Sequence, residues 1–149
     1  MGKTVTVLDE DNILHTLIVR KQGEAYSVIE NYGASSGFNS SPFFPRVEEA
    51  VEYFTAHVIS ANCAKQFEKA PLEHQQKILQ YIREHFVAGT TKRKSSVYSS
   101  YGLKHVVERG IGEYVSNGEL KGAMLKAGFT VDPQTKLSDI NWGFSLKKL

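Results

Sequence analysis

The sequence contains a single cysteine, Cys63, among its 149 residues. One cysteine cannot form an internal disulfide, and this scarcity indicates a protein of a reducing compartment. The five histidines do not combine with Cys63, or with one another, at the spacing that structural zinc sites use. We therefore expect no metal site and no other cofactor.

Long hydrophobic stretches are also missing. Runs such as Ile13-Leu14 and Leu17-Ile18-Val19 are interrupted by polar residues and fall far short of the ~20 residues that cross a bilayer. The first residues, Met1 to Val5, lack the apolar region and the cleavage site of a secretory signal. The pattern predicts a cytoplasmic protein without membrane contact.

Motifs that position phosphates or nucleophiles are absent as well. The glycine- and serine-rich loop at 33–42 has neither the Gly-Lys-Ser/Thr ending of a P-loop nor the spacing of a dinucleotide fingerprint, and no Gly-x-Ser-x-Gly elbow occurs. His105 and Glu108 would share a helix face and could exchange protons, although most such pairs are surface contacts. We expect no enzyme and assign no catalytic residue.

What the sequence does have is an uneven distribution of charge. The net charge of +2 divides near Gly89. Residues 1–89 have eight Lys/Arg and eleven Asp/Glu, a net charge of −3, and residues 90–149 have ten and five, a net charge of +5. A basic segment of this kind is typical of proteins that bind a polyanion or an acidic partner, although charged surfaces also serve simply to keep a domain in solution.

The N-terminal residues predict a β-meander covered by helices. Apolar residues alternate from Lys3 to Leu8, and further strands are predicted for 13–20 and 25–30, each after a polar turn. A helix is predicted from Pro45 to about Phe67, and a second one from Pro71 to a stop at Gly89.

The C-terminal residues predict a helix-helix-strand unit after an exposed basic linker at 90–96. The first helix begins at Ser99 or Ser100 and ends at Gly110. The second follows a capping box formed by Ser116 and Glu119 and ends at Gly128. A closing strand is predicted for 141–149. We therefore expect an α+β protein with subdomains 1–89 and 90–149, or one compact domain overall.

The C-terminal unit resembles the recognition part of a winged helix-turn-helix, although its turn is longer than the usual 3–4 residues. The alternative is that these helices only pack on the meander. In the functional interpretation, cations contact phosphates, tyrosines stack on unpaired bases, and polar residues of the second helix face a groove. The expected binding residues are Lys92, Arg93, Lys94, Tyr98, Tyr101, Lys104, Arg109, Asn117, Lys121 and Lys126.

Three stretches carry a resemblance to known proteins: 99–109 (SSYGLKHVVER), 114–118 (YVSNG) and 122–129 (GAMLKAGF), with Asn141-Trp142 beyond them. They are similar to segments of small proteins encoded by phages, plasmids and integrative elements. The resemblance implies a bacterial host cell and action by binding. Our leading hypothesis is a non-catalytic nucleic-acid-binding protein, with DNA favoured over RNA. The alternative is a protein that binds and inhibits a host defence system, as anti-CRISPR or anti-restriction factors do.

Overall fold

The computed structural model describes residues 3–32, 37–88 and 96–149. The chain forms two compact units, Met1–Ala61 and Asn62–Leu149, which we name unit 1 and unit 2. Strands and helices occur in both units, so the predicted α+β class is confirmed. The unit boundary lies after Ala61, whereas the sequence suggested a division at Gly89. No helix in the described part of the chain has the length and apolar character needed to cross a bilayer.

Unit 1 contains an antiparallel sheet with the strand order β1-β2-β3-β4. Its strands are β1 (Thr4–Leu8), β2 (Leu14–Gln22), β3 (Ala25–Asn31) and β4 (Phe38–Ser40). The predicted meander is confirmed, and β4 adds a strand that the sequence did not predict. The first turn is fixed by Asp9, whose Oδ1 accepts hydrogen bonds from the amides of Asp11 and Ile13 (2.8 and 2.9 Å). Asn12 takes the left-handed conformation there (φ 64°), which asparagine tolerates better than most residues.

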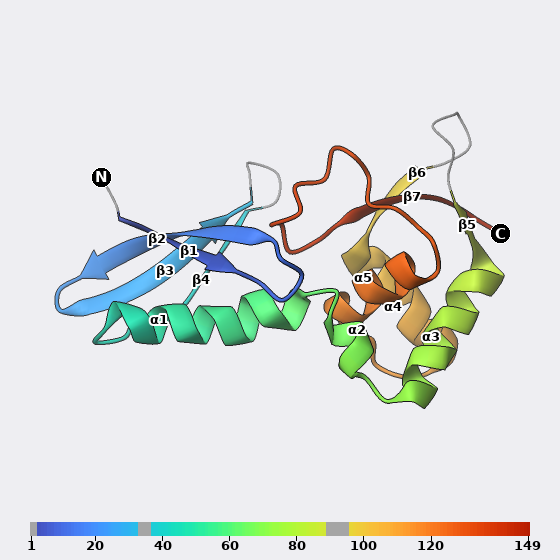
Figure 1. Cartoon of the computed structure of the whole chain (residues 1–149), viewed down its shortest axis with the longest axis horizontal. Helices are drawn as coiled ribbons and strands as arrows, with labels where there is room; N and C mark the ends of the chain where they lie inside the picture. The colour runs from blue at the N-terminus through green and yellow to red at the C-terminus, as the bar shows by residue number, and fades with distance from the viewer. Residues whose placement is uncertain (1–2, 33–36, 89–95) are drawn as a thin grey trace. The chain divides into compact units, whose positions relative to one another are not determined.

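The helix α1 (Val47–Phe54) lies along one face of this sheet (Figure 1). A π-helical turn, η1 (Thr55–Ile59), and a 3₁₀ turn, η2 (Ser60–Asn62), follow it. Ala50 and Phe54 are fully buried and pack with Leu17 and Val28 of the sheet. The predicted cover of the meander is thus confirmed, but the helical run ends near Asn62 instead of Phe67.

The other face of the sheet presents apolar side chains to solvent. Leu8 and Leu14, which are paired across β1 and β2, are 61% and 59% exposed. Phe38 on β4 is 59% exposed. We name the surface that carries these three residues the open face of unit 1.

The described residues of unit 2 form four helices and a small antiparallel sheet. The helices are α2 (Gln66–Lys69), α3 (Leu72–His85), α4 (Ser100–Ile111) and α5 (Asn117–Lys126). The strands are β5 (Phe86–Ala88), β6 (Ser96–Ser99) and β7 (Gly143–Lys148), in the order β5-β7-β6. Figure 1 shows these helices on one side of the sheet. The core between the two layers includes Leu103, Leu120, Met124, Phe144 and Leu146.

Three predicted boundaries in unit 2 differ from the structure. The helix α3 ends at His85, because Phe86 to Ala88 pair with β7 as a strand. Ser96, assigned to the linker, begins β6. Gly112 (φ 72°) ends α4 in place of Gly110, since a left-handed C-terminal residue is where glycine is favoured. The capping box at Ser116 and Glu119 is confirmed.

The order of elements in unit 2 resembles a winged helix with a reduced wing. The strand β6 lies between α3 and α4, and β7 lies in the middle of the sheet. The strand that would complete a wing after α5 is represented by a single bridge between Val131 and Phe144. The helix α5 follows α4 in the chain and precedes this bridge.

Candidate nucleic-acid interface

Three of the ten expected binding residues lie outside the described residues: Lys92, Arg93 and Lys94. The described residues that flank them are fixed on the sheet. Ala88 of β5 and Ser96 of β6 both pair with Leu146 of the central strand β7. The chain therefore leaves and rejoins the sheet beside the same residue.

The helix α5 is buried over most of its surface, which corrects the expectation that Asn117 and Lys121 face a partner. Asn117 is 7% exposed and Lys121 is 3% exposed. The Asn117 Nδ2 donates to the Asn62 Oδ1 (3.0 Å) and to the Ile140 carbonyl (2.9 Å). The Lys121 Nζ donates to the Asn62 carbonyl (2.9 Å) and lies 4.6 Å from the centroid of the Trp142 ring. Both side chains therefore form hydrogen bonds to other residues of unit 2.

The segment from Asn62 through α2 packs against α5. A Cβ atom on Gly122 would lie 2.3 Å from the Ala64 carbonyl oxygen and 2.4 Å from the Phe67 Cβ. Ala64 and Phe67 also belong to the hydrophobic core of unit 2. The cover is thus part of the core, and the exposed side chains of α5 are confined to its last turn, at Leu125 and Lys126.

Lys104 is a further correction, because it is only 7% exposed. Its Nζ lies 3.3 Å from the Glu108 Oε1 and 4.7 Å from the centroid of the Tyr114 ring. Glu108 also accepts a hydrogen bond from the Val115 amide (3.2 Å) and contacts His105. The hydrogen bond from the Val115 amide is the largest cause of a lowered pKa of Glu108, and the hydrogen bond with His105 is the next largest. Glu108 is an ionised carboxylate that ties α4 to the residues before α5.

The exposed ridge of α4 consists of Tyr101, His105 and Arg109, which follow one another at four-residue spacing and so share one face of the helix. We name these three residues the α4 ridge. Tyr101 is 54% exposed, Arg109 is exposed and His105 is half-buried. The rings of Tyr101 and His105 meet at a centroid distance of 4.6 Å and an angle of 85°. Two of the expected binding residues, Tyr101 and Arg109, therefore lie together at the surface.

Tyr114 stands beside the α4 ridge and was missed by the sequence reasoning. It lies in the connection between α4 and α5 and is 71% exposed. The Lys104 Nζ lies 4.7 Å from the Tyr114 centroid and 6.0 Å from the Tyr101 centroid. Both tyrosine rings therefore lie near the same ammonium group. A surface tyrosine in a short loop has no periodicity that would single it out in a sequence.

The two remaining expected residues lie apart in the secondary structure. Tyr98 is on β6, where it is half-buried and packs against the core, with the Lys148 Nζ 4.7 Å from its ring centroid. Lys126 is exposed in the last turn of α5. Tyr98 is therefore a packing residue as well as a neighbour of a cation.

His105 and Glu108 form the pair that could move a proton. The His105 Nδ1 lies 2.9 Å from the Glu108 Oε2. In the described part of the chain no hydroxyl or thiol group hydrogen-bonds to the His105 ring. The pair can orient an imidazole, but a nucleophile that it could activate is not in hydrogen-bond contact.

The two units differ more in net charge than residues 1–89 and 90–149 do. Unit 1 has four Lys/Arg and eight Asp/Glu, a net charge of −4, and unit 2 has fourteen and eight, a net charge of +6. Carboxylates of unit 2 are engaged in ion pairs at Glu68, Glu73, Glu108 and Glu113. Six exposed cations of unit 2 have no described carboxylate at ion-pairing distance: Arg83, Arg109, Lys126, Lys136, Lys147 and Lys148.

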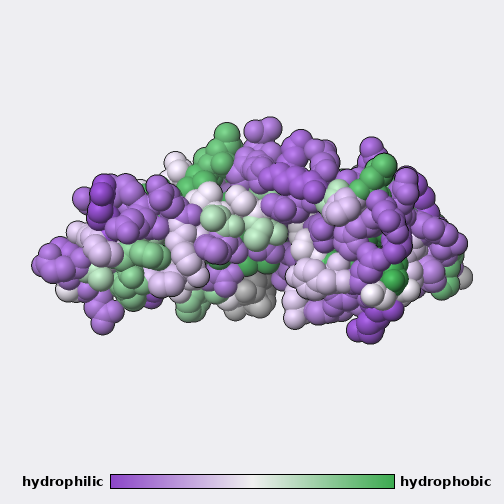
Figure 2. All heavy atoms as spheres, turned by 90° about the horizontal axis from the view of Figure 1, so that it is seen from below, coloured by the Kyte–Doolittle hydropathy of each residue, from purple (hydrophilic) through white to green (hydrophobic). Residues whose placement is uncertain are grey.

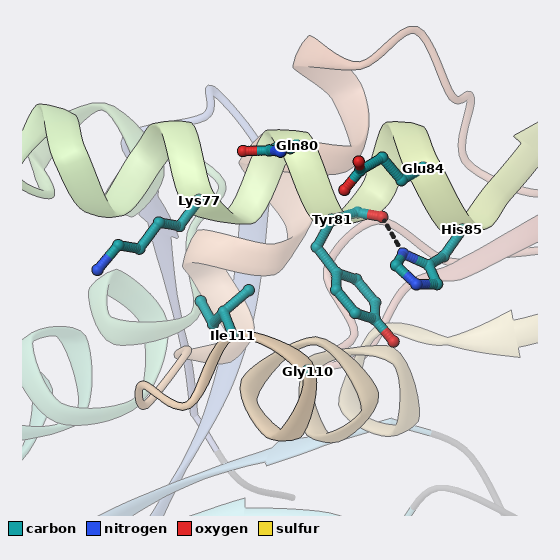
Figure 3. Close-up of a pocket in the computed structure, with 7 residues that line it drawn as sticks. All are labelled: Lys77, Gln80, Tyr81, Glu84, His85, Gly110 and Ile111. Atoms are coloured by element: carbon teal, nitrogen blue, oxygen red, sulfur yellow. Dashed lines mark hydrogen bonds between the residues drawn. The ribbon is translucent and has the colours of Figure 1, made fainter.

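A pocket of about 500 Å³ lies between α3 and α4. Figure 3 shows the Tyr81 ring reaching from α3 toward Gly110 of α4, and a Cβ on Gly110 would lie 2.0 Å from the Tyr81 ring. His85 stacks on Tyr81 (3.9 Å, 13°). Lys77 at the pocket edge is paired with Glu113, and this hydrogen bond raises the pKa of Lys77 and lowers that of Glu113. The pocket is a gap in the packing beside the stacked rings of Tyr81 and His85. The ammonium group at its edge, that of Lys77, is already paired with Glu113.

Unit 1 contains a buried charged cluster that the sequence did not reveal. His15 is 6% exposed, and its ring nitrogens lie 2.6 Å from the Glu30 Oε2 and 2.7 Å from the Asp9 Oδ2. The Tyr32 hydroxyl donates to the other oxygen of Glu30 (2.8 Å). Burial disfavours the imidazolium, but the hydrogen bonds to Glu30 and Asp9 outweigh it and raise the pKa of His15 above its ordinary value. Both ring nitrogens are occupied, so the cluster stabilises the sheet and offers no free base.

Hydrophilic side chains cover most of the molecular face drawn in Figure 2, with smaller hydrophobic patches between them. No family model, curated protein or solved structure matches the chain.

Proposed function

We propose that the protein binds nucleic acid through unit 2 and acts by occupancy, without catalysing a reaction. The observation that carries the proposal is the set of six exposed cations in unit 2 that no described carboxylate neutralises. A nucleic acid offers the complementary surface, because each phosphate that a cation neutralises releases condensed counterions and adds affinity.

The cations occur in several elements of unit 2, which favours contact along a backbone over recognition of one compact anion. Arg109 lies on the α4 ridge, and Lys126 is at the end of α5. Lys147 and Lys148 lie on β7 next to the start of β5. The sequence adds Lys92, Arg93 and Lys94. Phosphate contacts of this kind give affinity that depends on salt and little on sequence.

Titration of the full chain with a generic duplex and a generic single strand, each at two salt concentrations, tests the proposal. We expect measurable affinity at low salt that falls steeply as salt rises. Simultaneous replacement of Lys92, Arg93 and Lys94 by Ala should reduce the slope of log K against log salt by about 2–3, since each phosphate contact contributes about 0.7–0.9.

The matched control is Arg46→Ala. Arg46 is an exposed cation of the acidic unit 1, and it is paired with Glu48, so its loss should leave the salt slope unchanged. If neither nucleic acid binds at low salt, or if the triple variant keeps the full slope, the proposal fails.

The second candidate is a protein-binding inhibitor of a host defence system, and the open face of unit 1 favours it. Leu8, Leu14 and Phe38 are each about 60% exposed there, and apolar side chains of this kind suit a protein partner better than a phosphate backbone. In this case the basic surface of unit 2 would occupy a site of the target that normally holds nucleic acid.

Inhibition of a nuclease complex in the presence of excess competitor DNA separates the two candidates. An inhibitor of the protein target should saturate near one molecule per target site and retain its effect with competitor. A protein that coats nucleic acid should lose its effect. Inactivation of a large excess of target by a trace amount would mean turnover, and would contradict both candidates.

A further inference from the structure

The surface of unit 2 is poorly suited to reading a DNA duplex. In a helix-turn-helix, the second helix enters the major groove and its exposed side chains contact base edges. Here the corresponding helix, α5, is covered by the segment that includes Ala64 and Phe67, both of which are core residues. The polar side chains Asn117 and Lys121 are used inside the unit. A duplex could therefore be held through its phosphates but not read by α5.

The exposed side chains beside α4 have a different character. Tyr101 and Tyr114 are 54% and 71% exposed, and both rings lie near the Lys104 ammonium. Lys104 is paired with Glu108 (3.3 Å), so its charge is largely satisfied within the fold. Arg109, on the same ridge as Tyr101, has no described carboxylate at ion-pairing distance. The surface therefore combines two accessible rings with a cation that is free to meet an anion.

We propose that the α4 ridge together with Tyr114 is a stacking surface for the unpaired bases of single-stranded nucleic acid, with Arg109 on the phosphate backbone. This inference rests on the proposed function and names its ligand class. Stacking requires bases that are not already stacked in a duplex, and every base has a face that a tyrosine ring can meet. The Lys104 ammonium lies 4.7 Å from the Tyr114 centroid and 6.0 Å from the Tyr101 centroid, where it attracts the faces of both rings. Charge complementarity favours a nucleic-acid strand over a neutral apolar peptide at this site.

Fluorescence anisotropy of labelled oligonucleotides with the full chain tests the inference. The probes are a ~20-nucleotide oligo-dT, the matching oligo-rU and a ~20-base-pair duplex, lengths that span one small binding domain. The variants are Tyr101→Ala and Tyr114→Ala, with Tyr101→Phe and Tyr114→Phe as matched controls that keep the ring. We expect each Ala variant to weaken single-strand binding by roughly 5- to 150-fold, the range that corresponds to loss of one stacked base. The Phe variants should stay within about twofold, because stacking needs the ring and not the hydroxyl.

Salt dependence separates stacking from charge at this surface. Arg109→Ala should reduce the single-strand salt slope by about 0.7, whereas both Tyr→Ala variants should leave the slope unchanged. Duplex affinity should be insensitive to the tyrosine variants. Oligonucleotides that contain 5-bromouracil should cross-link to Tyr101 or Tyr114 on irradiation, and a role of these tyrosines in folding alone would not produce such a cross-link.

The possible results distinguish failure of this inference from failure of the proposed function. If no probe binds at low salt, the proposed function fails and the inference fails with it. If the duplex binds as tightly as the single strands, and the tyrosine variants change nothing, the protein binds nucleic acid by charge alone and only the inference is overturned. If an Ala variant has a lower unfolding midpoint, the result for Tyr114 decides, since this ring is the more exposed of the two. Comparison of oligo-dT with oligo-rU then tells which backbone the surface prefers.

Discussion

Gly122 of α5 lies directly against the carbonyl group of Ala64, so closely that a Cβ atom at position 122 would stand 2.3 Å from that oxygen. We expect Gly122→Ala to destabilise unit 2 by about 1–3 kcal/mol or more, because the helix would have to move away from its cover. This cost opposes the gain of about 1 kcal/mol that alanine brings to an exposed helix interior. Urea unfolding followed by the fluorescence of Trp142, the one tryptophan, reports on unit 2.

Gly102→Ala is the matched control, since Gly102 is also helical but a Cβ there would meet nothing closer than the Ser99 Oγ at 3.6 Å. This variant should be neutral or stabilising by up to about 1 kcal/mol. Equal unfolding midpoints for the two variants would contradict the close contact between α5 and Ala64.

Lys121 and Lys126 lie on the same helix and should respond in opposite ways. Lys121→Ala removes a buried hydrogen bond to the Asn62 carbonyl, and we expect it to cost about 1–3 kcal/mol of stability without changing the salt slope of binding. Lys126→Ala removes an exposed cation, and should change stability by less than about 0.5 kcal/mol while reducing the slope by up to about 0.9. The reverse pattern would mean that Lys121, and not Lys126, contacts the nucleic acid.

The start of α5 depends on its capping box and on the core beneath it. The Ser116 hydroxyl oxygen accepts a hydrogen bond from the Glu119 amide (3.0 Å), and the Glu119 carboxylate accepts one from the Ser116 amide (2.8 Å). Ser116→Ala should cost about 1 kcal/mol. Met124 is fully buried. Met124→Ala should therefore lower the free energy of unfolding by about 2–5 kcal/mol. Denaturant midpoints measure both changes, and a neutral Met124→Ala would mean that its stripe is not part of the core.

The stability of unit 1 should depend on pH through His15. Its pKa in the folded state is raised above the ordinary value of 6.5, so the folded state holds the proton more tightly than the unfolded chain. The resulting stabilisation is fully present below about pH 6.5 and is lost as pH rises through the folded pKa. Urea unfolding followed by NMR signals of the sheet should therefore give a lower midpoint at about pH 9 than at about pH 6. His15→Asn should flatten this dependence, and His57→Asn, which changes an exposed histidine, should preserve it. A midpoint that rises over the same interval would disagree with a protonated His15 in the folded sheet.

Local signals account for the features that the sequence predicted. The meander follows from two-residue alternation and polar turns, and the capping box needs only Ser116 and Glu119, three residues apart. The short strands β5 and β6 were not predicted, because Phe86 to Ala88 continue a helical pattern and become a strand only by pairing with β7. Such pairing is a tertiary effect that local propensity does not encode.

The candidate site was harder to predict because polar residues were assumed to be exposed. Lys121 and Asn117 both bond to Asn62, which is more than 50 residues away in the chain, and no periodicity reveals such a partner. Tyr101 and Arg109 lie at the surface of α4, four residues on either side of His105. The contact between His15 and Glu30 was not predicted, because these residues are 15 positions apart and meet only when the strands of the sheet pair.

The central position of β7 sets the order in which the chain can fold during synthesis. The sheet of unit 1 is complete once Ser40 has left the ribosome, because its four strands are consecutive. The sheet of unit 2 has to wait for Gly143–Lys148, since β5 and β6 make no pair with each other and both pair with β7. At ordinary translation rates this leaves an interval on the order of ten seconds. The helices of unit 2 are synthesised within this interval, before the strand that closes their core, and they are then most open to capture by a chaperone.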